Sequence, residues 1–427
     1  MAKIAVIGAG YVGITTAVCF SHLGHDVVVA DQSESRVESL RSGDCPIFEV
    51  DLPEFLSKAL SGDRLSFSNS NTDSVNDADF VFLCLPTPQS ADGTADISIL
   101  FAVIDEVRSS LKVNSILVTK STVPIGTSKT IVERLNRTDV EVVSNPEFLR
   151  EGSAIFDFLN PDRVVIGARN NEIAKRVSRL YTDFISEFVF TSNESAEIIK
   201  YASNSFLAMK ISFINSIAAI CELADADIFE VTEGIGSDKR IGRSFLSPGP
   251  GWGGSCFPKD SIALLRTAQH LGFDFSMLST VIKANDDQFR RVASKIVNVK
   301  RQTTDALRVC VLGLTFKSGT DDMRDSPALS IIRLLKMDGV VIKAYDPKVT
   351  KESSETIGPE VEIVDNLDDA ISGADVIAIL TEWEEFQTLK PENVAKLVRE
   401  RNIVDGRNVL NPVQWKSSGF AYTGVGR

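Results

Sequence analysis

Histidine and cysteine are both scarce in this sequence of 427 residues, which contains three histidines and six cysteines. The histidines do not stand in the spacing of a zinc motif, so neither a zinc site nor a histidine-based triad is expected. The cysteines form no CxxC pair, and a chain of this length does not need disulfide bonds for stability. We therefore expect no bound metal and a reducing environment.

Long hydrophobic runs and excess positive charge are also missing. No apolar stretch approaches the roughly 18 residues that span a bilayer, and no charged leader precedes the strand-like segment Lys3–Ile7. The 45 basic and 58 acidic residues give a net charge of −13, which disfavours nucleic acid or an anionic membrane as the main partner. We expect a soluble, cytoplasmic protein in which local positive charge meets any anionic ligand.

Short apolar segments alternate with helical patterns over the first 190 residues. At roughly 150 residues per domain, the length suggests two to three domains. Alternation of this kind indicates a parallel sheet covered by helices. The predicted strands of this part are Ile4–Ile7, Val27–Ala30, Phe80–Leu85, Ile116–Thr119, Val140–Ser144 and Val164–Gly167.

A long helical pattern without proline or glycine runs from Glu194 to Ala226 and is apolar around much of its circumference. A second helix is predicted at Ser276–Lys300, followed by a polar connection at Arg301–Asp305. The α/β alternation then resumes, with helices at Pro327–Met337 and Leu367–Ile371. The strands predicted there are Leu307–Leu312, Val340–Ala344, Val361–Val364, Val376–Leu380 and Asn402–Val404. We therefore predict an α/β protein with two Rossmann-like doubly wound domains joined by a central helical region.

The segment Gly8-Ala9-Gly10-Tyr11-Val12-Gly13 follows the first predicted strand and opens a helical pattern. In such a motif the first glycine allows a tight turn, the second lets the backbone approach a pyrophosphate, and the third lets the helix pack close to the strand. Asp31 ends the next strand, where a carboxylate can bind the ribose hydroxyls and repel a 2′-phosphate. The spacing predicts NAD binding, while nearby Arg36 leaves NADP as an alternative.

The most unusual stretch is Gly253-Gly254-Ser255-Cys256-Phe257-Pro258-Lys259-Asp260, which places a cysteine between a glycine pair and the helical pattern Ile262–Leu271. A thiol near a helix N-terminus and beside a lysine is expected to favour the thiolate, which is the form that attacks a carbonyl carbon. Asp260 lies one helical turn further on. We predict that Cys256 is a nucleophile and that the other five cysteines are structural.

Lys200 and Asn204 are four residues apart in the long central helix, so they share one face. A lysine and an amide there can polarise a carbonyl oxygen or hold an oxyanion. Taken alone, such a pair is more often a solvated helix face.

Polar side chains also follow several predicted strands. Glu147 and Glu151, in the segment Asn145–Gly152, offer carboxylates to a water or a hydroxyl. Thr87 and Thr122 similarly follow strands. The carboxyl ends of strands are where ligands bind in such sheets.

These motifs together resemble those of the nucleotide-sugar dehydrogenases, the UDP-glucose/GDP-mannose dehydrogenase family. The match covers residues 1–411 and rests on GAGYVG, KSTVPIGT, SNPEFLREGSA, KYASNSF, DKRIG, PGWGGSCFPKD and FKSGTDDMRDSP. The resemblance implies a domain that binds NAD, a central region that forms a homodimer, and a domain that holds the nucleotide of the sugar. We expect these at residues 1–193, 194–302 and 303–427, respectively.

The resemblance also implies roles for individual residues. The expected catalytic residues are Cys256, Lys200, Asn204, Asp260, Thr122, Glu151 and Glu147. The expected cofactor-binding residues are Gly8, Gly10, Tyr11, Val12, Gly13, Asp31, Arg36, Thr87, Thr122, Glu151 and Arg324. The expected substrate-binding residues are Phe148, Leu149, Arg150, Lys200, Asn204, Arg240, Phe245, Leu246, Gly253, Phe257, Lys317 and Arg407, with Arg240 contributed by the neighbouring subunit.

The implied reaction is a four-electron oxidation of UDP-glucose at C6 to UDP-glucuronate, through a thiohemiacetal and a thioester on Cys256. The segments DFLNPDRVVIG and PGWGGSCFPKD favour UDP-glucose, and GDP-mannose or a UDP-N-acetylhexosamine is the alternative substrate. Alternatives from other classes are a single-step hydroxyacid dehydrogenase and a non-catalytic NAD-binding protein. Neither of these would need a cysteine nucleophile.

Overall fold

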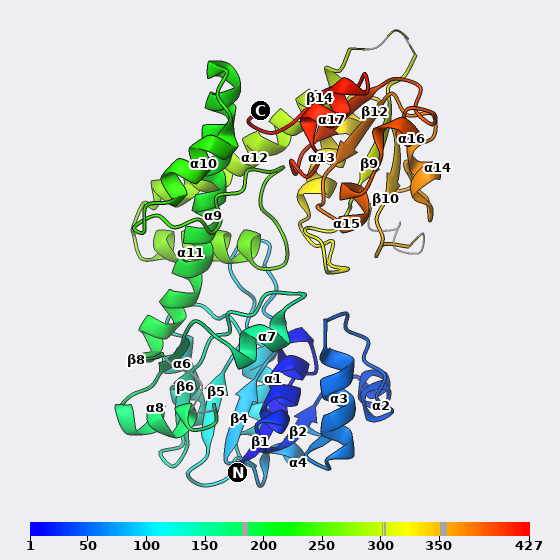
Figure 1. Ribbon diagram of the computed structural model, residues 1–427. Helices are drawn as coiled ribbons and strands as arrows, with labels where there is room; N and C mark the ends of the chain where they lie inside the picture. Colours follow the sequence, from blue (N-terminus) through cyan, green and yellow to red (C-terminus); the bar gives the residue numbers. More distant parts are fainter. Residues whose placement is uncertain (182–186, 301, 303–304, 351–356) are drawn as a thin grey trace. The chain divides into compact units, whose positions relative to one another are not determined.

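The computed structural model describes residues 1–181, 187–300, 302, 305–350 and 357–427 (Figure 1). The chain forms two compact units, the first from residues 1–203 and 262–273 and the second from residues 204–261 and 274–427. Helices α9 (Asn193–Ala224) and α11 (Phe257–His270) contribute residues to both. Of the predicted polar connection, residues 301, 303 and 304 lie outside the described residues.

The first unit is built on an eight-stranded sheet of order β3-β2-β1-β4-β5-β6-β7-β8. Its pairs are parallel except β6 with β7, which meet antiparallel at Ser144 and Gly167. The strands are β1 (Lys3–Ile7), β2 (Asp26–Ala30), β3 (Leu65–Ser68), β4 (Phe80–Leu83), β5 (Ile116–Thr119), β6 (Glu141–Ser144), β7 (Val164–Gly167) and β8 (Phe188–Thr191). The parallel sheet predicted here is confirmed, and β3 and β8 are additional strands.

Helices cover both faces of this sheet, as Figure 1 shows. Side chains alternate along β1, so Ile4 and Val6 join one core and Ala5 and Ile7 join the other. The first core contains residues of α1 (Tyr11–His22), α2 (Glu34–Arg41), α3 (Leu52–Ser61), α7 (Ala154–Leu159) and α8 (Asn171–Ser178). The second contains residues of α4 (Asn71–Val75), α5 (Ser98–Val107) and α6 (Thr127–Leu135). Burial on both faces explains why these strands are continuous apolar runs.

The second unit contains a six-stranded parallel sheet of order β11-β10-β9-β12-β13-β14. Its strands are β9 (Arg308–Leu312), β10 (Val341–Tyr345), β11 (Val361–Ile363), β12 (Val376–Ile379), β13 (Asn402–Asp405) and β14 (Ala421–Thr423). Its other helices are α10 (Ile228–Gly236), α12 (Ser276–Val297), α13 (Pro327–Met337), α14 (Leu367–Ile371), α15 (Glu384–Gln387), α16 (Pro391–Val394) and α17 (Pro412–Ser417). The predicted pair of Rossmann-like sheets and the long central helix are confirmed.

Helix α9 is also long and apolar enough, by length and composition, to cross a membrane. The core helix of a soluble protein meets the same criterion, and one such helix is weak evidence for a membrane protein. Its first half carries Glu197 and Lys200, both buried and bonded to other parts of the first unit. These contacts are typical of a helix packed within a folded protein.

Candidate active site

The glycine-rich turn joins β1 to α1 in the first unit. Gly8 has a φ of 102°, and a Cβ on Gly13 would lie 1.8 Å from the carbonyl oxygen of Gly8. By contrast, a Cβ on Gly10 would meet no atom within 4 Å. The turn is therefore closed where the helix packs on the strand and open at Gly10, as a dinucleotide pyrophosphate requires.

Asp31 lies beside this turn, at the end of β2. Its Oδ2 accepts a hydrogen bond of 2.8 Å from the Ala9 N–H, and its Oδ1 accepts one of 2.9 Å from the Ser33 N–H. Arg36 lies 3.2 Å from the same carboxylate, and its side chain is 44% exposed. The residues present fit an adenosine ribose, because the carboxylate is held in place at the carboxyl edge of the sheet.

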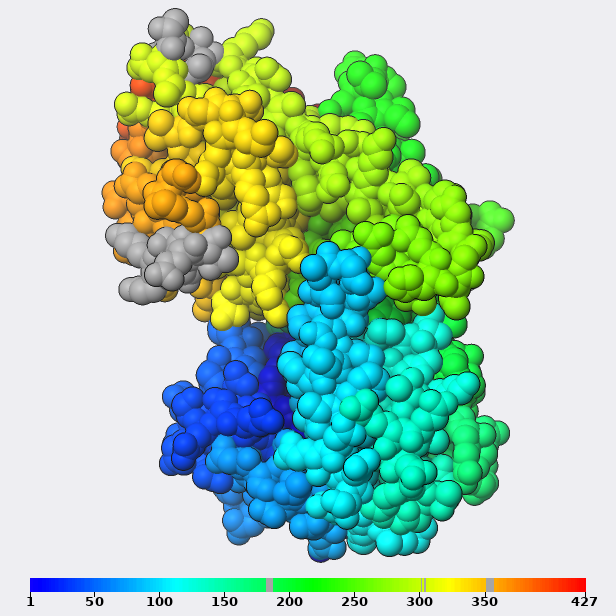
Figure 2. Space-filling model, turned by 180° about the vertical axis from the view of Figure 1, so that it is seen from behind, coloured from blue at the N-terminus to red at the C-terminus, as the bar shows by residue number. Residues whose placement is uncertain are grey.

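The other predicted cofactor residues of the first unit lie at this same edge. Tyr11 and Val12 form the first turn of α1, and the Thr87 hydroxyl donates a 2.9 Å hydrogen bond to the carbonyl of Thr122. The segment that follows β4 and carries Thr87 stands out from the surface of the first unit, in light blue in Figure 2. Thr87 and Thr122 are thus brought together by neighbouring strands.

A buried ion pair links the central helix to the loop after β6. The Lys200 ammonium donates hydrogen bonds of 2.8 Å to the Glu147 carbonyl and 2.9 Å to its Oε1, while Oε2 accepts 2.7 Å from the Leu149 N–H. Burial alone would raise the pKa of Glu147, but the charge and hydrogen bond of Lys200 lower it overall. Lys200 is therefore part of a fixed polar site, and not of a solvated helix face.

A second buried lysine, Lys120, was not singled out in the sequence. Its ammonium lies 3.2 Å from Asn145 Oδ1, which also accepts a 2.6 Å hydrogen bond from the Tyr181 hydroxyl. Burial lowers the pKa of Lys120 to about 8. Only structure could reveal it, because a lysine that follows a strand usually points into solvent.

The loop carrying Phe148, Leu149 and Arg150 is held by its own neighbours. The Arg150 guanidinium pairs with Asp157 at 2.5 Å, and the Arg163 guanidinium lies 3.6 Å from the centre of the Phe148 ring. Further along, the Gly152 and Ala154 N–H groups, on either side of Ser153, both donate to Glu49. Glu49 and Arg163 are further residues that sequence reasoning missed.

The cysteine loop lies in the second unit. Cys256 is half-buried and immediately precedes α11, and its carbonyl accepts a 2.9 Å hydrogen bond from the Asp260 N–H. The two Asp260 oxygens bind separately, Oδ1 to the Lys259 ammonium at 2.6 Å and Oδ2 to the Asn204 amide at 2.6 Å. Asp260 is 1% exposed. Asn204 and Asp260, predicted from separate segments, are thus in direct contact.

Glycines also allow close approach around this loop. A Cβ on Gly253 would lie 2.0 Å from the Asp325 carbonyl, so only glycine fits. Phe245 has a φ of 62°, an unusual conformation for a bulky residue, and its ring lies 6.3 Å from that of Phe257. Next to it, Leu246 is buried. Strain of this kind is typical of functional sites.

The predicted cationic residues of the second unit differ in how they are held. Arg407 is tied down by the carbonyls of Leu380 and Phe316, each at 2.9 Å, and by the Glu382 carboxylate at 3.0 Å. Arg324 and Arg240 are exposed and each pairs with an aspartate two residues earlier. Lys317 lies 5.6 Å from the centre of the Phe316 ring. Arg407 is preorganised, while Arg240 and Arg324 remain on the surface.

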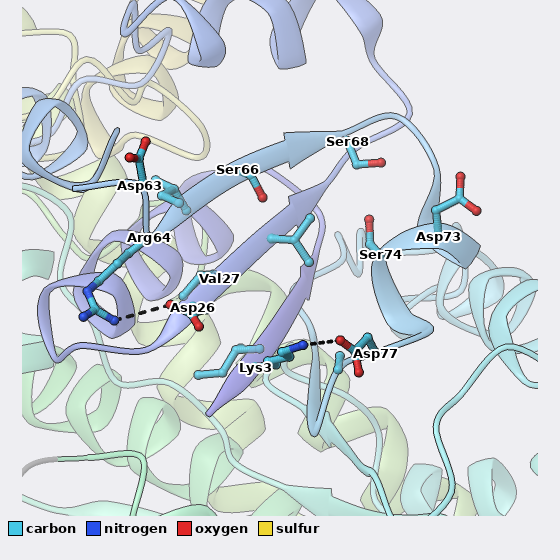
Figure 3. Close-up of a pocket in the computed structure, with 14 residues that line it drawn as sticks. Lys3, Asp26, Val27, Asp63, Arg64, Ser66, Ser68, Asp73, Ser74 and Asp77 are labelled. Carbon is cyan, nitrogen blue, oxygen red and sulfur yellow. Dashed lines mark hydrogen bonds and ion pairs between the residues drawn. The ribbon is translucent and has the colours of Figure 1, made fainter. Parts of the chain in front are cut away.

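A separate hollow of about 370 Å³ lies along β3 and at the amino ends of β1 and β2 (Figure 3). Its charged side chains are largely paired, Lys3 with Asp77 and Arg64 with Asp26. None of the predicted site residues is among the described residues that line it. We therefore do not assign it to the active site.

Comparison with known proteins supports one family along most of the chain. Three domain models of the UDP-glucose/GDP-mannose dehydrogenase family match: the NAD-binding domain at residues 2–185, the central domain at 194–287 and the UDP-binding domain at 310–412. The chain belongs to this family. It is accordingly an NAD-dependent oxidoreductase, and its C-terminal sheet is the family's domain for the UDP-sugar.

Curated relatives and solved structures agree with this assignment to the UDP-glucose/GDP-mannose dehydrogenase family. The chain is 41% identical to UDP-glucose 6-dehydrogenase TuaD of Bacillus subtilis, over 100% of this chain and 94% of the relative. It is 42% identical to the UDP-glucose 6-dehydrogenase of Rhizobium meliloti, over 100% and 99%. A UDP-glucose dehydrogenase structure from Pyrobaculum islandicum matches with a TM-score of 0.90 at 36% identity, over 100% of this chain and 98% of that one.

Proposed function

We propose that this enzyme oxidises UDP-glucose at C6 to UDP-glucuronate, with two NAD per sugar. The observation that carries the proposal is Cys256, a half-buried thiol at the start of α11, next to the Asn204–Asp260–Lys259 cluster. A single-step alcohol dehydrogenase has no use for such a nucleophile. The curated relatives above are named for UDP-glucose, which favours this sugar over GDP-mannose and UDP-N-acetylhexosamines.

When bound, NAD supplies a hydride acceptor for each oxidation. In the first oxidation a hydride leaves C6, while Asp260 acting through water, or Lys200 in its neutral form, takes the proton of the C6 hydroxyl. The Cys256 thiolate then adds to the aldehyde carbon, forming a thiohemiacetal that cannot diffuse away. Loss of the second hydride from the oxyanion of this thiohemiacetal leaves a thioester on the sulfur. Lys200 and Asn204 stabilise the oxygen charge in these steps.

Hydrolysis completes the proposed reaction. Thr122 and Glu151 orient the attacking water, with Glu147 as a second acid. When this water attacks the thioester carbon, the carbon–sulfur bond breaks and the sulfur leaves as thiolate. A proton of the water passes to the Glu151 carboxylate. No electrons are exchanged in this step. Covalent capture thus lets a single pocket carry out a four-electron oxidation.

We further propose that residues 1–193 bind the cofactor, that 194–302 form the dimer and that 303–427 hold the nucleotide of the sugar. We also propose that the enzyme works in the cytoplasm. The preorganised Arg407 supports a role in binding the pyrophosphate. The other proposed substrate contacts are Phe148, Leu149, Arg150, Phe245, Leu246, Gly253, Phe257 and Lys317, together with Arg240 from a neighbouring subunit. Tyr11, Val12, Thr87 and Arg324 complete the proposed cofactor contacts.

The proposed partner of α9 is a second copy of this chain. Phe206, Phe213 and Ile220 recur every seven residues and are each more than half exposed, and Leu223 is 90% exposed. A seven-residue spacing places these side chains in one stripe, which is typical of paired helices. Light scattering should report a dimer, and Phe213→Asp should shift it toward monomer; a wild-type monomer at micromolar concentration would contradict this assembly.

A panel of nucleotide sugars, with NADH measured per sugar consumed, tests the reaction. We expect two NADH per UDP-glucose, and one NADH, or faster turnover of GDP-mannose or a UDP-N-acetylhexosamine, would overturn the proposal. Cys256→Ala should lower acid formation by at least about 100-fold and leave NAD affinity unchanged. Cys45→Ala, at another half-buried cysteine, is the control and should be nearly neutral.

A further inference from the structure

Glu49 is a buried carboxylate in the loop between α2 and α3, and only 4% of it is exposed. Its Oε2 accepts hydrogen bonds from the Tyr11 hydroxyl and, at 2.7 Å, from the Gly152 N–H. Its Oε1 accepts one of 2.8 Å from the Ala154 N–H. No side-chain cation among the described residues lies within ion-pair distance of Glu49, so these three groups are the donors that the buried carboxyl group has.

These three donors belong to the two parts of the first unit that the reaction uses. Tyr11 is the first residue of α1 and follows Gly10, the open position of the cofactor turn. Gly152 directly follows Glu151, and Ala154 begins α7. The Tyr11 hydroxyl also lies 3.3 Å from the Arg150 carbonyl. A single carboxylate therefore ties the cofactor turn to the backbone on the C-terminal side of Glu151.

The amino-terminal side of this loop has further anchors of its own. Glu147 is anchored by Lys200, and the Arg150 N–H donates a 2.9 Å hydrogen bond to Asp157. Glu151 lies between these anchors and the contacts of Glu49. Movement of the Glu49 carboxylate would therefore shift Glu151 without releasing the Lys200–Glu147 pair.

We propose that Glu49 is a positioning residue that couples the cofactor turn to Glu151 and thereby supports thioester hydrolysis. This inference rests on the proposed function, in which Glu151 orients the attacking water. Tyr11 remains a hydrogen-bond donor throughout, because burial and the neighbouring Glu49 both raise its pKa. Glu49 itself does not touch the reacting atoms in this proposal; it acts through Tyr11 and the backbone of residues 152–154.

The test is Glu49→Gln, which keeps the size of the side chain but replaces one acceptor oxygen with an NH₂ group facing donors. We expect kcat to fall about 10- to 100-fold, while NADH formation in the first turnover changes less than about 3-fold. A burst of two NADH per active site should then precede slow turnover. Mass spectrometry of the quenched enzyme should show a UDP-glucuronyl adduct on Cys256. A burst and a steady-state rate that fall together, or that both stay unchanged, would overturn the proposal.

Two further variants separate positioning from general loss of structure. Tyr11→Phe removes one donor, and its effect on kcat should be strongly non-additive with that of Glu49→Gln in a double-mutant cycle. Glu54→Gln removes an exposed carboxylate of α3 that pairs with Lys58, and should leave the kinetics unchanged. The wild-type stoichiometry is measured in parallel: fewer than two NADH per UDP-glucose refutes the proposed reaction, whereas additive effects of Tyr11 and Glu49 refute the coupling alone.

Discussion

The two Rossmann-like sheets share their strand order around β1 and β9, yet they differ in the contacts made by the aspartate that follows the second strand. Each has an aspartate at the end of its second strand, Asp31 after β2 and Asp346 after β10. Asp31 Oδ2 accepts from the Ala9 N–H of the glycine turn and from the half-exposed Arg36 guanidinium. Asp346 Oδ2 accepts from the Leu314 N–H, from the Thr315 N–H and hydroxyl, and from the Trp383 indole. In the second sheet, side chains and backbone of the protein itself thus occupy the position equivalent to the proposed ribose site of the first.

The connections after the first strands differ in the same sense. Residues 8–10 alone separate β1 from α1, so backbone N–H groups at the helix start can meet a pyrophosphate. Residues 313–326 separate β9 from α13 and carry Lys317 and Arg324. One topology therefore carries two kinds of connection at this position: a short turn that presents backbone N–H groups, and a long loop that presents cationic side chains.

The largest expected effects come from adding a methyl group at a tightly packed glycine near the first strand of each sheet, one variant at a time. Gly13→Ala puts a Cβ 1.8 Å from the Gly8 carbonyl, and Gly313→Ala puts one 2.4 Å from Thr381 Cβ at a φ of 96°. We expect Gly13→Ala to weaken NAD binding more than about 100-fold with UDP binding retained, and Gly313→Ala to do the reverse. Calorimetric titration with each ligand checks this. Equal loss of both ligands in both variants would contradict the separate roles.

Opposite charges are buried at equivalent edges of the two sheets. Lys120 follows β5, and Asp405 ends β13. These two strands are equivalent, because β5 lies two places from β1 in the first sheet and β13 lies two places from β9 in the second. Burial lowers the pKa of Lys120 to about 8 and raises that of Asp405. Below pH 8, the charged Lys120 therefore destabilises the fold, and stability rises as pH increases from about 8 to the unfolded-state value near 10.5. For Asp405, stability falls as pH rises above the unfolded-state value near 3.8.

We predict that Lys120→Met removes an alkaline pH dependence of up to about 3 kcal/mol from the free energy of unfolding. Asp405→Asn should remove an acidic dependence of opposite sign. Denaturant titrations from pH 4 to pH 10.5 measure both, with each variant compared with wild type. Parallel stability profiles for Lys120→Met and wild type above pH 8 would show that the buried lysine does not titrate as the structure indicates.

The two aspartates offer a smaller contrast. Asp346→Asn should destabilise the fold by about 1 to 3 kcal/mol, because the amide NH₂ would face the Lys348 N–H that Oδ1 accepts and the charge that the donors on Oδ2 meet would be lost. Asp31→Asn should cost less stability and should raise the KM for NAD several-fold, while improving use of NADP through the neighbouring Arg36. Thermal melting and kinetics with both cofactors check this pair. Equal destabilisation without a cofactor effect would remove the distinction between the two corners.

The fold could be predicted largely from sequence because buried parallel strands are apolar on both faces. All predicted strands are present, with ends that differ by at most two residues. The missed strands β3, β8 and β14 all lie at sheet edges and have three or four residues. Edge strands are partly exposed, and a short one such as Leu-Ser-Phe-Ser alternates apolar and polar residues over only four positions, too few to distinguish it from a loop.

The candidate site divides in a similar way. The residues of the glycine turn and the cysteine loop are close in sequence, so their spacing alone identifies them. Glu49 binds Tyr11 and Ala154, which are 38 and 105 residues away, and such a contact has no local pattern. The Lys200–Glu147 pair is intermediate, because both residues were predicted but their contact across 53 residues was not. The spacing of residues in a sequence does not show which residues far apart along the chain are in contact in the fold.

Substitution of Gly10 has the smallest expected effect, but it tests the difference between the two sheets most directly because it separates ligand binding from folding. Gly10→Ala adds a Cβ that meets no protein atom within 4 Å, so its melting temperature should match that of wild type. The same Cβ would stand where the turn has to approach a pyrophosphate, and the KM for NAD should therefore rise about 10-fold. Gly319→Ala, at another glycine with open surroundings but a φ of 79°, should cost some stability without changing NAD affinity. An unchanged KM for NAD in Gly10→Ala would mean that the space beside Gly10 is not where the cofactor binds. The proposed difference between the open position in the first sheet and the occupied one around Asp346 in the second would then be wrong.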